Sequence, residues 1–173
     1  MFTSALSAMD LTGIIFTGKP RQYRSDCQSG QFKIGASKMI GKSLEMQVLA
    51  WRTFEDELFA YPWQTWLEIL FVDPSNVVSH ILFKTESLDN FTNMAIELSQ
   101  NDRPIGSVTI VARMEKRSSS TNGNSYFAVE FETKPMDPDR FQEIIDFVEG
   151  IDLNGLSLGS TGNGNQPQLE AAE

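Results

Sequence analysis

Basic and aromatic side chains occur together in two segments of this sequence, a combination suited to binding single-stranded nucleic acid. In segment 19–52, seven Lys and Arg residues accompany only two acids, an excess of five positive charges. A second basic cluster lies at 113–117. Phe32 and Trp51 adjoin bases in the sequence, and Tyr126 is expected across a hairpin from the 113–117 cluster. Bases stack on such rings while Lys and Arg contact the phosphates.

The candidate nucleic-acid-binding residues are therefore most of the bases of these two segments, without Lys19, and several of the rings near them. They are Arg21, Arg24, Lys33, Lys38, Lys42, Trp51, Arg52, Phe54, Trp63, Arg113, Lys116, Arg117 and Tyr126. The alternative is that the bases form only a solvated, solubilising face. Alternation over 44–50 places Trp51 on the outward face of its strand, where it either stacks on bases or packs under a loop or in a subunit interface. The aromatic Trp66, within an apolar strand, is expected in the core.

The charge of the chain is polarised along its length. The formal net charge is −9, and after residue 136 eight acids accompany Arg140 alone. A phosphate backbone needs a local positive strip and tolerates distant negative charge. An acidic chain is therefore compatible with nucleic acid as a ligand.

The remaining inventory of chemically reactive side chains is small. His80 is the only histidine and Cys27 the only cysteine, which excludes a zinc cage, a disulfide framework and a paired-cysteine redox site. Nothing in the sequence pairs with His80, so we expect a structural histidine rather than a catalytic base. Segment 35–43 has five residues between its glycines where a P-loop has four, and an alternating strand follows where a P-loop needs a helix. The acids at 55–57 are a solvated run, and we expect no metal or other cofactor.

Periodicity predicts the elements that position these residues. Alternating or doubly apolar patterns predict strands at 43–54, 64–72, 77–85, 104–116 and 125–134, with weaker candidates at 11–17 and 31–39. The turn at 73–76 joins two apolar strands into a central hairpin. Amphipathic helices are predicted at 87–99, capped by Ser87, and at 138–149, opened by Asp137-Pro138.

The length of 173 residues fits one domain with a tail. We assign 1–30 to an N-terminal extension with a basic segment, 31–153 to the folded domain, and 154–173 to a disordered Gly/Asn/Gln-rich tail. A single free cysteine, no basic region ahead of an apolar run at the N-terminus, and no long apolar stretch predict a cytoplasmic protein without a membrane span.

Three strands, a helix and two further strands are the element order of the five-stranded OB barrel. The chain therefore resembles single-stranded DNA-binding proteins of the OB fold over roughly 31–134, and also in its flexible tail. Bacterial members of that family end in an acidic peptide closed by Pro-Phe, which recruits replication and repair partners. Here the chain ends in 168–173, QLEAAE, which is acidic but lacks Pro-Phe. The resemblance also implies a homo-oligomer.

The predicted fold is mainly β: a five-stranded OB-type barrel with a helix between strands 3 and 4, extra N-terminal strands and a C-terminal helix. The expected function is binding of single-stranded DNA without strong sequence preference and without catalysis, in replication, repair or recombination. The main alternative is a non-catalytic protein-interaction or assembly module whose aromatic rows and 138–149 helix form interfaces. A small enzyme built on His80 is the third.

Overall fold

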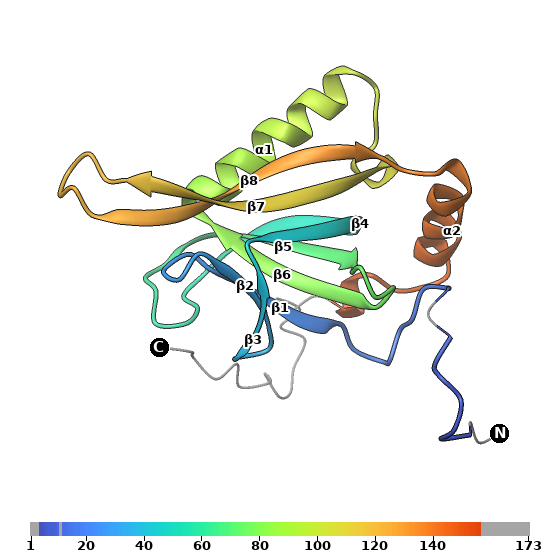
Figure 1. Cartoon of the computed structure of the whole chain (residues 1–173). Coiled ribbons are helices and arrows are strands. Elements are labelled where there is room, and N and C mark those ends of the chain that lie inside the picture. The colour runs from blue at the N-terminus through green and yellow to red at the C-terminus, as the bar shows by residue number, and fades with distance from the viewer. Residues whose placement is uncertain (1–3, 11, 157–173) are drawn as a thin grey trace.

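The computed structural model describes residues 4–10 and 12–156 and shows a mainly β chain curled into a half-barrel (Figure 1). The strands are β1 (Arg21–Asp26), β2 (Gln31–Ile34), β3 (Lys38–Gly41), β4 (Ser43–Asp56), β5 (Gln64–Val72), β6 (Val78–Lys84), β7 (Val108–Ser118) and β8 (Ser125–Pro135). The helices are α1 (Thr85–Gln100) and α2 (Pro138–Glu149), with short 3-10 turns η1 (Ile105–Ser107) and η2 (Asn154–Leu156).

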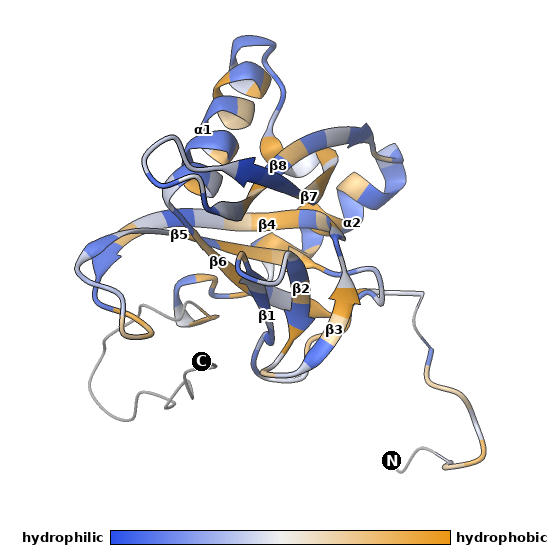
Figure 2. Ribbon diagram, turned by 60° about the vertical axis from the view of Figure 1, so that its left-hand side comes forward, coloured by the Kyte–Doolittle hydropathy of each residue, from blue (hydrophilic) through white to orange (hydrophobic). Residues whose placement is uncertain are grey.

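The strands form one eight-stranded sheet in the order β3-β2-β1-β6-β5-β4-β7-β8. All neighbours are antiparallel except β1 and β6, which are parallel. Alternating apolar residues of β4 and β7 and the doubly apolar β5 and β6 supply the core, which α1 covers on one side (Figure 1). Figure 2 shows hydrophobic residues along β4 and β6, whereas β7 and β8 carry hydrophilic residues near the loop that joins them.

The predicted strands and helices are confirmed to within a few residues, with local exceptions. Of the predicted strand 11–17, the described residues 12–17 contribute an isolated bridge between Ile15 and Val77. Segment 31–39 is divided into β2 and β3 by a turn. Residues 21–26, assigned by sequence to an extension, form β1 and pair with both β2 and β6. The polar composition of β1 concealed it, because its partners rather than its own pattern place it in the sheet. Of the predicted tail, 154–156 form η2 and 157–173 lie outside the described residues.

A bulge in β4 overturns the predicted orientation of Trp51. The register with β5 shifts between Val48 and Ala50, so Trp51 lies opposite Ile69 on the core face. Its ring packs edge-on against Phe91 of α1, with centroids 5.5 Å apart, and the side chain remains 45% exposed. The inserted residue reverses the alternation on which the prediction rested.

The two helices begin in different ways. Asp137 caps α2 as predicted, because its carboxylate accepts hydrogen bonds from the amides of Asp139 and Arg140. The predicted cap of α1 by Ser87 is wrong, because α1 begins at Thr85 and Ser87 is buried inside its first turn. The Ser87 hydroxyl instead accepts a hydrogen bond of 3.0 Å from the amide of Val129, on the edge of β8.

The turn at 73–76 contains the most heavily bonded carboxylate of the described residues, Asp73, whose side chain is fully buried. Five donors bond to it: the Arg21 guanidinium (3.0 Å), the Tyr23 hydroxyl (2.8 Å), the amides of Ser75 (2.8 Å) and Val77 (3.0 Å), and the Ser79 hydroxyl (3.3 Å). Burial and the neighbouring Asp73 raise the pKa of the Tyr23 phenol, which therefore remains a donor. Asp73 thus joins the β5–β6 hairpin to β1.

In the described ranges, no helix combines the length and the apolar character needed to cross a membrane.

Replacing Asp73 should destabilise the whole domain. We expect Asp73→Ala to lower the free energy of unfolding by about 3–5 kcal/mol, because the buried donors lose their acceptor. Urea unfolding followed by circular dichroism measures the loss. Asp89→Ala, which removes an exposed acid from α1, is the control and should change the free energy by less than about 0.5 kcal/mol. Equal stability of the two variants would contradict the role given to Asp73.

Candidate functional site

A cavity opens where β1 separates from β6. Their pairing is limited to Arg21 with Ser79 and Gln22 with His80. Beyond these pairs the two strands border a cavity of about 500 Å³, which we call the β1–β6 cleft. It is lined by residues 22–28 of β1 and its turn, 82–87 of β6 and α1, 126–128 of β8, and by Lys33, Phe59, Tyr61 and Trp66.

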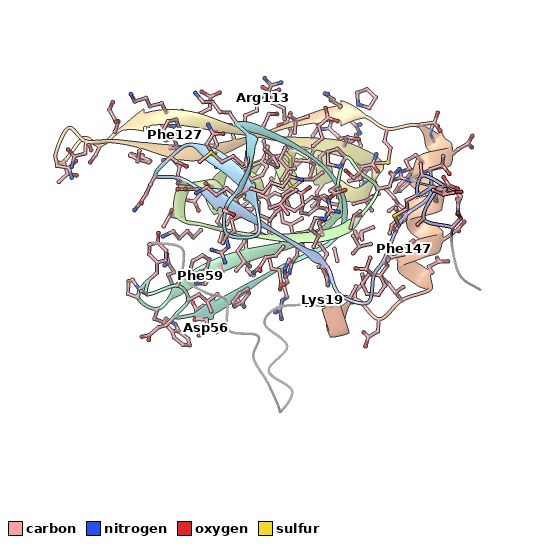
Figure 3. The ribbon with its side chains drawn as sticks, turned by 60° about the horizontal axis from the view of Figure 1, so that its bottom comes forward. Lys19, Asp56, Phe59, Arg113, Phe127 and Phe147 are labelled. Carbon is pink, nitrogen blue, oxygen red and sulfur yellow. The ribbon has the colours of Figure 1, made fainter. Side chains whose placement is uncertain are left out.

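The far end of β1 is fixed to β8, which closes the cleft on that side. The Cys27 carbonyl accepts a hydrogen bond of 3.1 Å from the amide of Phe127. Gly30, at φ 70°, allows this contact, because a Cβ at that position would lie 2.7 Å from the Phe127 ring. Figure 3 shows β1 and β2 passing between Phe127 and Phe59, with Lys19 and Phe147 farther along the molecule. Both ends of β1 are therefore held by hydrogen bonds, and the cleft is a fixed feature of the fold.

Aromatic rings from β5 and the preceding loop form one wall of the cleft. Phe59 and Tyr61 pack edge-on against Trp66, with ring centroids 5.8 and 6.0 Å away. Trp66 is only 3% exposed, which confirms the predicted core position, and its indole donates to the Asp56 carbonyl. Tyr61 is 41% exposed and presents its ring to solvent and to the cleft. This wall offers apolar faces to a planar ligand.

Lys84, at the end of β6, places an ammonium group against these rings. Its Nζ lies 2.8 Å from the centroid of Tyr61 and 5.7 Å from that of Trp66, so two rings hold the cation. Burial lowers the pKa of Lys84 below its ordinary value. None of the ion pairs between described residues involves Lys84.

A second cation of the cleft, Lys33, is neutralised. Its ammonium lies 2.6 Å from a carboxylate oxygen of Asp26. Burial alone would raise the pKa of Asp26, but the hydrogen bonds from Lys33 and from the amides of Ser29 and Gln28 outweigh it and lower the pKa to about 2. Lys33 thus has a carboxylate partner, whereas aromatic rings surround Lys84.

Glu86, in the first turn of α1, organises the mouth of the cleft. It accepts hydrogen bonds from the Tyr126 hydroxyl (2.7 Å) and from Nε of Arg117 (2.9 Å). Arg117 also contacts Glu130. Two residues that the sequence predicted for nucleic-acid binding therefore meet at one carboxylate.

The predicted basic strip is divided in the structure. The cleft contains Arg24, Lys33 and Tyr126 of the predicted set. Elsewhere, carboxylates pair with Arg21 (Asp73), Arg52 (Glu68), Arg113 (Glu132) and Arg117 (Glu86 and Glu130). Lys38, Lys42 and Lys116 are exposed, Trp63 is 62% exposed, Trp51 packs on α1, and Phe54 lies under the Arg52 guanidinium.

The predicted set lacks several residues that line the cleft, among them the aromatic Phe59 and Tyr61 and the charged Lys84 and Glu86. The aromatic content of 59–66 was a usable signal for the first two. The sequence signal for Lys84 was weaker: it is the only Lys or Arg in the apolar run 77–84. Nothing in the sequence pairs Glu86 with Tyr126, because 40 positions separate them.

His80 is buried, as predicted, on the face of β6 opposite that of the core residue Ile81. Its Nδ1 lies 3.8 Å from the Glu68 carboxylate and makes no hydrogen bond within the described ranges. Arg52 bonds to the same carboxylate at 2.8 Å. No group of three or more His, Cys, Asp or Glu side chains in the described part of the chain could hold a metal ion.

The Cys27 thiol lines the cleft, and its reactivity can be used to measure how buried the cleft is. Burial raises the pKa of this thiol above its ordinary value of 9.0. Because the thiolate is the reactive form, we expect iodoacetamide to alkylate Cys27 at pH 8 more slowly than it alkylates glutathione. Mass spectrometry measures the rate, and unfolding in urea should restore ordinary reactivity. A native rate equal to that of glutathione would contradict the buried environment.

Comparison with known proteins adds no assignment. No protein-family model matches the chain, and no curated protein or solved structure matches it. The chemistry of the cleft is therefore inferred from its own residues.

Proposed function

We propose that the protein binds single-stranded DNA in the β1–β6 cleft, without strong sequence preference and without catalysis. The observation that carries the proposal is the position of Lys84. A half-buried ammonium without an ion pair among the described residues lies between aromatic rings, in a cleft of about 500 Å³. A phosphate would supply the missing counter-charge, and the rings would supply stacking surfaces.

The size and shape of the cleft favour a single strand over a duplex. Its volume lies within the range of small-ligand pockets, about 300–1,000 Å³. One or a few nucleotides of an extended strand fit such an opening, whereas a stacked duplex hides the faces of its bases. The exposed rings of Tyr61 and Tyr126 line the cleft and would stack on the bases of such a strand.

The strand order supports an OB-type interpretation of the barrel. Strands β6-β5-β4-β7-β8 are consecutive neighbours, and α1 connects β6 to β7. In an OB barrel these are strands 3-2-1-4-5, and ligands bind on strands 2 and 3 and their flanking loops. The β1–β6 cleft uses β6, Trp66 of β5 and the loop that precedes it. β1 occupies the seam where β6 and β8 would otherwise meet.

Exposed lysines extend the positive surface beyond the cleft. Lys38, Lys42 and Lys116 have no ion pair within the described ranges, and the Lys42 carbonyl accepts from the amide of Met114 in β7. The paired arginines contribute less, because their carboxylates already neutralise them. We therefore propose modest, salt-sensitive affinity, with a homo-oligomer adding contacts in replication, repair or recombination.

Anisotropy of a fluorescein-labelled oligo(dT) tests the proposal. Binding should weaken steeply between about 50 and about 200 mM NaCl, because phosphate contacts release counterions. Lys84→Gln should weaken binding and make the log–log salt slope shallower by about 0.7, the loss of one contact. Tyr61→Ala should cost about 1–3 kcal/mol of binding free energy. An unlabelled duplex should compete poorly.

Lys19→Gln is the matched control, since it removes the same charge from an exposed site outside the cleft. If Lys84→Gln and Lys19→Gln bound oligo(dT) with equal affinity, the β1–β6 cleft would not be the binding site. If the protein did not bind oligo(dT) even at the lower salt concentration, nucleic-acid binding would be excluded as its function. The protein-interaction alternative would then be favoured, and the exposed apolar side chains of Trp63 and Met39 are candidates for that interface.

A further inference from the structure

The mouth of the β1–β6 cleft contains an acid, Glu86, beside the cleft residues proposed to bind a nucleic-acid strand. Glu86 lines the cleft together with Tyr126. Its two oxygens are used separately: Oε1 accepts from Nε of Arg117, and Oε2 from the Tyr126 hydroxyl. The side chains of Glu86 and Arg117 are each about one-third exposed, so solvent and ligands reach this group.

A phosphodiester makes the same contacts as this carboxylate. Both present two anionic oxygens to a guanidinium and a hydroxyl, and arginine binds either group in the same way. Arg117 retains Glu130 on its other nitrogen, so Nε can exchange its acceptor while the side chain remains in place. Displacement of Glu86 would also release the Tyr126 ring, which is 41% exposed, for stacking.

We infer that Glu86 acts as an internal substitute for a phosphate, which a bound single strand must displace from Arg117 and Tyr126. The inference rests on the proposed function and identifies the residue that limits affinity at the cleft mouth. Its effect is selective: a ligand must offer an anion and a stacking ring together to compensate for the lost contacts. An isolated anion would gain the contact with Arg117 but no stacking on a ring.

The protonation states agree with this role. Hydrogen bonds from Tyr126 and Arg117 hold the pKa of Glu86 below its ordinary value, so the carboxylate is charged at neutral pH. The same hydrogen bond raises the pKa of Tyr126, which therefore keeps its proton and its donor capacity. No other titratable group of the described chain bonds to Glu86 through its side chain.

Substitution of Glu86 tests the inference in the oligo(dT) assay. Glu86→Gln should tighten binding about tenfold at low salt, since one charged hydrogen bond becomes available to phosphate. The salt slope should steepen by about 0.7 for the added contact. Glu97→Gln removes the same charge from the exposed surface of α1 and should change affinity by less than twofold. Adding Arg117→Gln to Glu86→Gln should abolish the gain.

Four outcomes separate this inference from its premise. Tighter binding by Glu86→Gln but not by Glu97→Gln supports the inference. Equal tightening by both variants would reduce the effect to net charge and overturn it. Weaker binding by Glu86→Gln at an unchanged melting temperature would also overturn it, because Glu86 would then position Tyr126 for binding. Wild-type protein that binds no oligo(dT) overturns the proposed function itself.

A lower melting temperature for Glu86→Gln would indicate that the carboxylate ties α1 to the β7–β8 hairpin. In that case Tyr126→Phe provides the second measurement, since it keeps the ring, removes the hydroxyl and frees one oxygen of Glu86. Tyr126→Phe should then bind oligo(dT) at least as tightly as the wild type. A tenfold loss would overturn the inference.

Discussion

The buried carboxylate of Asp73 is the interaction on which the rest of the structure depends. It binds the turn that follows β5, the start of β6 and two side chains of β1 at a single point. Because β1 is attached there and again at Cys27, but pairs with β6 over only two residues, the strands separate between the two attachments. The β1–β6 cleft is the direct result of this arrangement.

Neighbouring carboxylates neutralise most of the arginines of the described chain, whereas several lysines have no ion pair there. Arg52, Arg113 and Arg117 are all bonded to acids on the adjacent strand or helix. Lys84 is different because rings rather than acids surround it. In an acidic protein this division leaves a small number of effective positive groups at defined positions, which limits nonspecific attraction of polyanions.

The β8 edge of the sheet is partly covered by α1 and by the β1–β2 turn, which also line the cleft. Ser87 and Asn90 of α1 bond to the amide and the carbonyl of Val129, and the Cys27 carbonyl bonds to the amide of Phe127. These groups satisfy part of the exposed edge of β8, which would otherwise be open to pairing with another chain. The helix and the β1–β2 turn thus both cover the edge of β8 and border the β1–β6 cleft.

Local sequence determined the features that depend on near neighbours. The alternation of 43–48, the Asp-Pro turn at 73–76, the Asp137 cap and the core position of Trp66 all follow from periodicity and turn chemistry, which act over a few residues. The tertiary structure alone decided the rest. The bulge that turns Trp51 toward α1, the pairing of β1 and the contact of Glu86 with Tyr126 depend on partners far away in the chain. Their energies come from burial and long-range hydrogen bonds, which no short sequence window contains.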